Sequence, residues 1–191
     1  TTVFRNSNLF QTEFSGELNL LAKVWKTTPE DARDRWTSLI LLAQKDKVET
    51  LVSGYENVYI SFINTDNEII ISGDKVNCNK VVAKLNCNAV EVPFQNVIHH
   101  DFCNKAYDEL IEMHNFPMEE CPNIDFYSSI SLKKLPFDSK TIAENSTKVC
   151  FRPVDFPKTC EYIYKEGARI FIELGANATC SNWIATNLKG K

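Results

Sequence analysis

The order of apolar and polar positions along the chain predicts a mixture of strands and helices. Residues 58–63 and 68–72 are rich in β-branched and aromatic side chains, and the polar stretch 64–67 separates them. Such side chains favour pleated, half-buried surfaces, and a short polar stretch between two such runs is typical of a turn. The two runs therefore predict a β-hairpin, and shorter strands are expected at 89–92 and 125–129.

Helices are expected where apolar residues recur with a period near 3.6. One is predicted over 18–24, and Thr28 followed by Pro29 predicts the cap and first turn of the next. The apolar positions within 36–42 keep a helical period, so the chain is expected to be helical there as well. Further helices are expected from the capping residue Asp74 through Leu85, over 104–113, over 155–166 and from residue 181 onward.

These elements together predict an α/β protein. The order strand, strand, helix, strand, helix, strand over 58–129 is that of a compact α+β unit of ferredoxin-like size. Beyond it, the helix 155–166 is expected to end at Gly167, because glycine is common just past a helix end. The apolar run 169–174 then predicts a fully buried strand.

Composition narrows the class of protein. The chain has 191 residues, of which 43% are hydrophobic and 24% charged, enough for a folded domain with a real core. A net charge of -4 offers no basic surface, so nucleic acid is not an expected partner. No apolar run approaches the roughly 18 residues that span a bilayer, so no membrane association is expected. Seven cysteines without a C-x-x-C pair are typical of buried, reduced thiols in a cytoplasmic protein.

Candidate chemistry centres on two adjacent histidines, His99 and His100, which lie between a predicted strand and a predicted helix. Three interpretations are open: a polar loop with Asp101 as a helix cap, a zinc site, or a general base. A zinc site would draw on His99, His100, Asp101, Cys103 or His114. Adjacent histidines point in different directions and no second ligand pair has metal spacing, so no bound metal is predicted. A general base would use an imidazole that titrates near neutrality.

A general base needs a nucleophile, and the sequence offers no clear one. There is no G-x-S-x-G elbow, no glycine-rich phosphate loop and no H-E-x-x-H pattern. Ser72 precedes a glycine but stands at the end of a predicted strand. Cys103 is four residues from His99 and could act as a local nucleophile, although packing as a buried thiol is its expected role.

Four segments, in order, resemble the C-terminal half of malonyl/acyl-CoA:carrier-protein acyltransferases. The hairpin 63–74 resembles a signature of that family, and the run VIHHDFC at 97–103 resembles its histidine motif. The run RPVDF at 152–156 and the run GARIFIELGA at 167–176 resemble two later motifs. The segments near both ends of the chain narrow the resemblance to the acyltransferases of polyunsaturated fatty acid and heterocyst glycolipid synthases.

The resemblance implies a two-part fold. A large α/β-hydrolase-like subdomain carries an inserted ferredoxin-like small subdomain, here expected at 56–130. The stretches 1–55 and 131–191 would then be part of the large subdomain. The nucleophilic serine of the family would precede Thr1, so the chain is expected to lack it and to be inactive by itself.

The resemblance also implies the reaction and its residues. An acyl group would move from coenzyme A to the missing serine and then to the phosphopantetheine thiol of an acyl carrier protein, with no bound cofactor. His99 would be the catalytic base, and the backbone carbonyl of Val149 would orient it. The expected substrate-binding residues are Asn64, Phe94, His100 and Asn177.

The expected partners are the acyl carrier protein and other domains or subunits of a multi-enzyme synthase. Two other functions stay open. The ferredoxin-like unit could be a non-catalytic module that docks a carrier protein or a neighbouring synthase domain. A small metal-dependent hydrolase centred on His99 and His100 is the other.

Overall fold

The computed structural model describes residues 8–119, 121 and 123–191 of the chain. Its first half contains the elements η1 (Leu9–Glu13), α2 (Asn19–Trp25), α3 (Pro29–Arg35), β1 (Trp36–Leu42), α4 (Lys45–Val52), β2 (Val58–Thr65), β3 (Glu68–Asp74), α5 (Lys75–Leu85) and β4 (Ala89–Glu91). Its second half contains η2 (Asp101–Ala106), α6 (Tyr107–His114), β5 (Phe126–Ser128), β6 (Lys133–Leu135), α7 (Ser139–Cys150), β7 (Val154–Asp155), α8 (Phe156–Lys165) and α9 (Thr179–Asn187).

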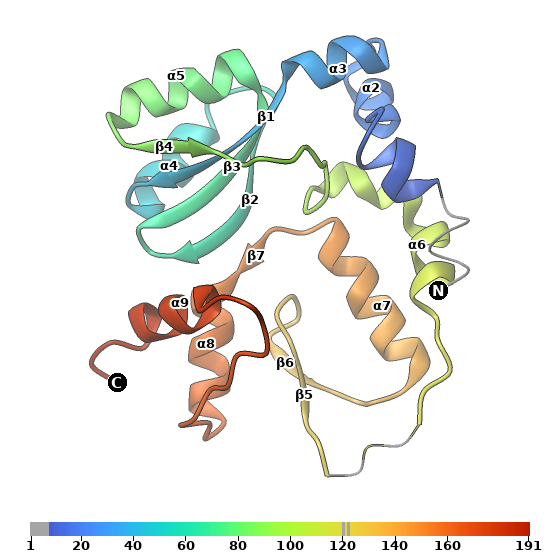
Figure 1. The fold of residues 1–191 in the computed structure, drawn as a ribbon, viewed down its shortest axis with the longest axis vertical. Coiled ribbons are helices and arrows are strands. Elements are labelled where there is room, and N and C mark those ends of the chain that lie inside the picture. The colour runs from blue at the N-terminus through green and yellow to red at the C-terminus, as the bar shows by residue number, and fades with distance from the viewer. Residues whose placement is uncertain (1–7, 120, 122) are drawn as a thin grey trace.

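A five-stranded sheet with the order β4-β1-β3-β2-β7 organises the molecule. Its first four strands, with α4 and α5, form a β-α-β-β-α-β unit whose order is that of a ferredoxin-like fold. Strands β1 to β4 pair antiparallel, and β7 joins the edge of β2 in parallel. Figure 1 shows this sheet in the upper part of the molecule, with α7, α8 and α9 below it.

Local signals in the sequence account for several elements. The predicted hairpin is confirmed as β2 and β3, joined at Asp66 and Asn67. Asp74 caps α5, since its carboxylate accepts hydrogen bonds from two backbone amides of the first turn. Thr28 caps α3 by accepting one from Asp31, and Pro29 opens that helix. The helices expected near the start, over 104–113, over 155–166 and near the end are confirmed as α2, α6, α8 and α9.

The helix expected over 36–42 is wrong, because this segment is strand β1. It lies between β3 and β4, so both of its edges form backbone hydrogen bonds. Leu39 and Leu41 pack on one face against the core under α4 and α5, and Trp36 belongs to a second core on the other face. Apolar residues also occupy the less buried face of β1, where Ile40 is partly buried and Leu42 is 54% exposed, so apolar and polar residues do not alternate and the pattern matches a helical period.

The strand expected at 125–129 exists but does not belong to the ferredoxin-like unit. As β5 it pairs only with β6, in a separate two-stranded sheet. The unit predicted over 58–129 therefore includes α6 and β5, which lie outside the ferredoxin-like unit, and lacks β1 and α4 at its beginning. The division of the chain into a large subdomain at 1–55 and 131–191 and a small one at 56–130 stays a prediction.

The buried strand expected at 169–174 is wrong. Residues 168–174 form no strand, and three of their apolar side chains face solvent: Ile170, Ile172 and Leu174 are 83%, 80% and 95% exposed. A strand is stable only when a neighbouring edge satisfies its backbone groups, and no strand in the described part of the chain pairs with this segment. The apolar composition of the run predicted burial, but burial depends on a partner strand.

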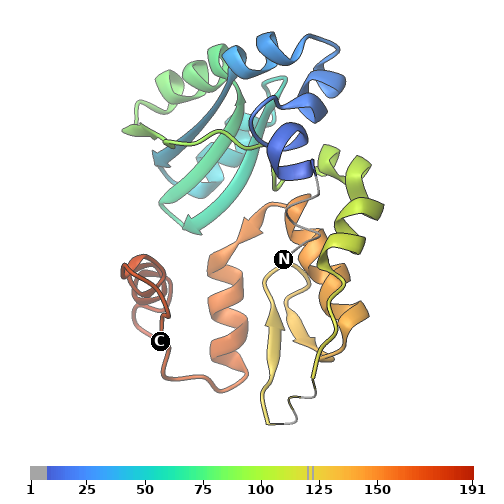
Figure 2. The same ribbon diagram turned by 45° about the vertical axis from the view of Figure 1, so that its right-hand side comes forward.

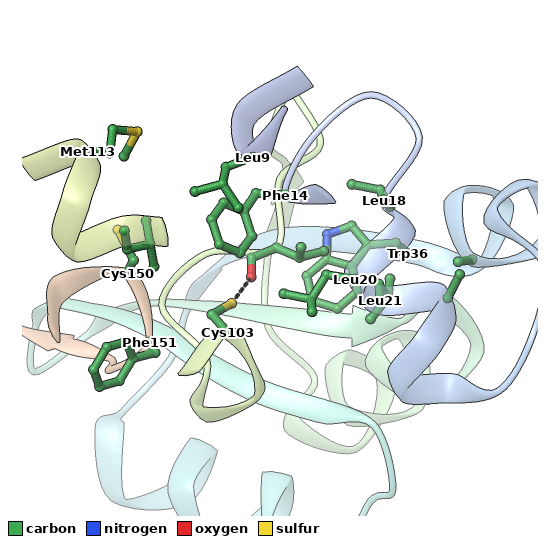
Figure 3. Close-up of a cluster of buried hydrophobic side chains, with 14 residues drawn as sticks. Leu9, Phe14, Leu18, Leu20, Leu21, Trp36, Cys103, Met113, Cys150 and Phe151 are labelled. Atoms are coloured by element: carbon green, nitrogen blue, oxygen red, sulfur yellow. Dashed lines mark hydrogen bonds between the residues drawn. The ribbon is translucent and has the colours of Figure 1, made fainter. Parts of the chain in front are cut away.

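Two hydrophobic cores flank the sheet. One fills the space between the sheet and the helices α4 and α5, and Ile71 and Val81 are fully buried in it. The other joins the start of β1 to η1, α2, α6 and the end of α7, and Figure 3 shows Phe14, Trp36 and Cys103 within it. The helices α6 and α7, which lie side by side in Figure 2, contribute Leu110, Met113 and Cys150 to this second core, and Val97 of the loop between β4 and η2 packs in it.

Among the helices that the structure describes, none combines the length and the apolar composition needed to cross a bilayer.

Candidate active site at His99

The loop that carries His99 is fixed to the end of helix α7. The backbone amide of His99 donates a hydrogen bond of 2.6 Å to the carbonyl of Cys150. The amide of Val97 donates another, of 2.9 Å, to the carbonyl of Phe14. His99 adopts a positive φ of 71°, a backbone conformation that costs free energy in a residue other than glycine. The hydrogen bonds at His99 itself and at Val97, two residues before it, therefore hold a strained backbone in place.

The imidazole of His99 is oriented through one of its two ring nitrogens. Its Nδ1 lies 2.7 Å from the carbonyl oxygen of Val149, so Nδ1 carries the proton and donates it there. Nε2 is consequently the basic nitrogen of the neutral ring. The ring of Phe62 packs edge-to-face on the imidazole with centroids 4.3 Å apart. This geometry agrees with the expectation that Val149 orients the histidine through its backbone carbonyl.

Burial sets the titration of His99. The residue is only 7% exposed, and this desolvation lowers its pKa below the ordinary value of 6.5. Hydrogen bonds with the backbone of Val149 and Arg152 act in the opposite direction and offset part of the change. At neutral pH the imidazole is therefore uncharged and can accept a proton.

A cavity of about 250 Å³ opens beside His99, against the face of the sheet opposite α4 and α5. Most of its wall is apolar, contributed by Phe62, Ile70, Val92, Phe94 and Ile98. A second, larger hollow of about 570 Å³, near Lys47 and Asn88, is lined by no histidine. The smaller cavity therefore combines an apolar surface with a basic nitrogen.

Three serine hydroxyls form a row across neighbouring strands at the wall of this cavity. Ser38 on β1 and Ser72 on β3 are paired in register, and their hydroxyl oxygens are 2.8 Å apart. Ser61 lies at a bulge in β2, and its hydroxyl is 2.7 Å from that of Ser72. Each hydroxyl thus has a partner within the row. The sequence signal was weak, because each serine is a single polar residue within a largely apolar strand.

His100 has a different environment from His99. Its ring is 3% exposed and packs among Trp36, Tyr59 and Phe102, with centroids 5.1–5.5 Å away. Its Nε2 lies 3.5 Å from the hydroxyl of Ser61 at the end of the serine row. Burial, with a smaller contribution from His99, lowers the pKa of His100 to about 3. The ring is neutral at neutral pH and acts as part of the aromatic packing behind the cavity.

We expect His100 to make the stability of the chain depend on pH. In the unfolded chain its pKa is near 6.5, whereas folding lowers it to about 3, so the unfolded state binds an extra proton between these values. The contribution of His100 to the free energy of unfolding is therefore fully present well above pH 6.5, and it is lost as the pH falls below this value. Relative to His100→Phe, which keeps an aromatic ring, the wild-type chain should lose about 2 kcal/mol more between pH 6.5 and 4.5. Urea unfolding at a series of pH values measures this difference, and parallel curves for the two chains would contradict it.

The other expected substrate-binding residues lie in three different places. Phe94 shares the cavity with His99 and is 62% exposed. Asn64 is buried at the end of β2, where its side chain donates to Glu68 and its carbonyl accepts from Asn187 of α9. Asn177 is exposed in the loop before α9. The structure thus brings Phe94 to His99 and gives Asn64 a role in joining the hairpin to α9.

Two other interpretations of this region, Cys103 as a nucleophile and a metal site, can also be compared with the structure. Cys103 is fully buried, its thiol donates to the carbonyl of Val97 at 2.7 Å, and burial raises its pKa to about 12 (Figure 3). A thiol with so high a pKa is a packing group and a poor nucleophile. Across the residues that the structure describes, no three His, Cys, Asp or Glu side chains are grouped so that they could hold a metal ion.

The fold is that of acyltransferase domains. The malonyl-CoA:acyl carrier protein transacylase from Xanthomonas oryzae superposes with a TM-score of 0.71 and 18% identity, over 81% of this chain and 52% of that one. The acyltransferase domain of the second module of the salinomycin polyketide synthase superposes with a TM-score of 0.65 and 14% identity, over 81% of this chain and 37% of that one. A malonyl transacylase solved with its type II polyketide acyl carrier protein superposes with a TM-score of 0.70 and 14% identity, over 81% of this chain and 52% of that one.

In sequence, the chain is homologous to part of a polyunsaturated fatty acid synthase subunit of Thraustochytrium sp.. The two are 26% identical over 205 aligned residues, which cover 98% of this chain and 10% of that larger polypeptide. No protein-family profile matches the chain. The chain thus spans about a tenth of this relative and between a third and just over half of the three acyltransferase structures. The family resemblance inferred from the sequence motifs is confirmed by this homology and by the fold.

Proposed function

We propose that this chain contributes the general base of an acyltransferase that moves an acyl group from coenzyme A to an acyl carrier protein. The observation that carries the proposal is the hydrogen bond from His99 Nδ1 to the carbonyl of Val149, beside an apolar cavity. It fixes the tautomer in which Nε2 is free to accept a proton. The homology with a component of a polyunsaturated fatty acid synthase and the acyltransferase fold support it.

The proposed chemistry has two half-reactions. Nε2 of His99 takes the proton of a serine hydroxyl supplied by another part of a longer protein, and the serine oxygen attacks the thioester carbonyl. The C–S bond breaks, and the protonated imidazole returns its proton to the departing thiolate of coenzyme A. A phosphopantetheine thiol then gives its proton to Nε2 and attacks the acyl-serine ester. The C–O bond breaks and the serine recovers its proton.

The proposal also assigns partners and a compartment. The acyl acceptor would be an acyl carrier protein, and the neighbours would be further domains or subunits of a multi-enzyme synthase. A related structure holds a transacylase with its carrier protein. All seven cysteines are free thiols, which are stable in a reducing compartment, so the proposed location is the cytoplasm.

A pH profile of the full-length protein tests the role of His99. The base acts only when neutral, so kcat/KM for acyl transfer should rise with pH through the pKa of His99. Because burial lowers that pKa, the half-maximal point of this acidic limb is expected below pH 6.5. The measurement is transfer of labelled acyl groups from acyl-CoA to carrier protein between pH 4.5 and 8. An acidic limb centred above pH 6.5 would argue against a buried histidine as the base.

The 191-residue chain by itself serves as the negative control for the same assay. We expect it to form no acyl-enzyme from labelled acyl-CoA, because it would supply the base without the serine. Acyl-enzyme formed by this chain alone would place the nucleophile within it and overturn that part of the proposal.

A further inference from the structure

We infer that the cavity beside His99 selects a short, uncharged acyl group, and that Ile70 limits the length of this group. The inference rests on the proposed acyl transfer and adds to it the class of substrate. Three features of the cavity support this inference: it lacks charge, its hydroxyl groups are already hydrogen-bonded to one another, and its volume is small.

The walls of the cavity offer no positive charge. Apart from His99, which burial keeps neutral, every residue that lines it within the described part of the chain is apolar or an uncharged serine or asparagine. A carboxylate moved from water into such a cavity loses its hydration and gains no ion pair. The cavity therefore disfavours an acyl group with a terminal carboxylate and favours an alkyl one.

The serine row does not supply free hydrogen-bond donors for a charged group. The hydroxyls of Ser38, Ser72 and Ser61 are bonded to one another at 2.8 and 2.7 Å, which uses two of their three protons, and His100 Nε2, 3.5 Å from Ser61, is placed to accept the third. A carboxylate could accept hydrogen bonds from these hydroxyls only if the bonds between them were broken. An alkyl group leaves the row intact and contacts the neighbouring side chains of Phe62 and Ile70.

The volume and the position of Ile70 limit chain length. About 250 Å³ is less than the roughly 300–1,000 Å³ of pockets that hold drug-sized ligands, so a long fatty acyl chain exceeds the space. Ile70 stands on the central strand β3, paired with Ile40 on one side and Phe62 on the other. The core under α4 and α5 packs against the opposite face of this strand, so the strand cannot shift away from the cavity to enlarge it.

Acylation of the full-length protein by a panel of acyl-CoA thioesters tests the inference. Acyl-enzyme formation from acetyl-, butyryl-, malonyl- and palmitoyl-CoA would be followed by intact-protein mass spectrometry. We expect the acetyl or butyryl donor to react at least about tenfold faster than the malonyl and palmitoyl donors. Faster reaction with malonyl- or palmitoyl-CoA would overturn the selectivity. Absence of acylation by every donor would overturn the proposed acyl transfer itself.

Two variants assign the selectivity to the cavity. Ile70→Ala enlarges the cavity, so the palmitoyl rate should rise about tenfold relative to the acetyl rate. Ile69→Val, on the same strand but facing the opposite core, is the matched control and should leave this ratio unchanged. Phe94→Arg places a cation at an exposed position of the cavity, so it should raise the malonyl rate relative to acetyl. Unchanged ratios in both cavity variants would contradict the assignment.

Discussion

His99→Ala is expected to lower the rate of acyl transfer by the full-length protein about 10⁴-fold or more, as removal of a histidine base does in serine hydrolases. The reason is geometric: Nδ1 is held by the carbonyl of Val149, and Nε2 is the nitrogen that would take the serine proton. The effect should fall on kcat, because the histidine acts on the proton and contributes little to substrate binding. Single-turnover acylation with labelled acyl-CoA measures it directly.

The backbone of His99 requires a second variant, because its positive φ makes the loop sensitive to substitution. Asparagine tolerates this conformation better than alanine, so His99→Asn should preserve the loop and lose activity to a similar extent. His114→Gln is the matched histidine control, since His114 bonds to Thr147 away from the cavity and its loss should change activity less than threefold. A mild effect of both His99 variants, with unchanged thermal unfolding, would show that the base lies elsewhere.

Gly73→Ala is expected to destabilise the chain by about 2–4 kcal/mol. Gly73 has a φ of 147°, which residues with a side chain rarely adopt. A Cβ atom built there would lie 2.0 Å from the carbonyl oxygen of Asn57, so the backbone of β3 would have to move away from β2. Since Ser72 precedes Gly73, this movement would also disturb the serine row beside the cavity. Urea unfolding gives the free-energy difference.

Gly54→Ala is the matched control for this prediction. A Cβ atom at Gly54 would meet the carbonyl oxygen of Leu51 at 3.5 Å, which is an ordinary contact. The free energy of unfolding of the Gly54→Ala variant should therefore stay within about 0.5 kcal/mol of the wild-type value. Similar free energies of unfolding for the two alanine variants would show that the close contact between β3 and Asn57 can relax without cost.

The sequence predictions were correct where an element depends on interactions between residues close together in the chain, and they were wrong where it depends on distant ones. The hairpin of β2 and β3, the cap at Asp74 and the Thr28-Pro29 helix start were predicted correctly, since each depends on residues a few positions apart. The segment 36–42 was predicted as helix because apolar side chains stand on both faces of the strand, which hides its period of two. The run 169–174 was predicted as a buried strand because its composition is apolar, although no described strand pairs with it.

The candidate site shows the same division. The motif around His99 and its relation to Val149 could be inferred from the order of family-like segments in the sequence. The neighbouring histidines, however, have the same side chain and differ only in surroundings. The fold alone places His99 beside a cavity and encloses His100 among Trp36, Tyr59 and Phe102.

By itself, the sequence predicted most of the local elements, the resemblance to acyltransferases and the two adjacent histidines as candidate site residues. The tertiary structure decided which histidine is available for chemistry and which strand begins the ferredoxin-like unit. It also brought Ser38, Ser61 and Ser72 together from three strands to form a wall of the cavity. These outcomes depend on which faces of the sheet are covered and on contacts between residues far apart in the sequence, such as Trp36 and His100. Such contacts leave no periodic or local signal in the sequence, because they exist only once the chain has folded.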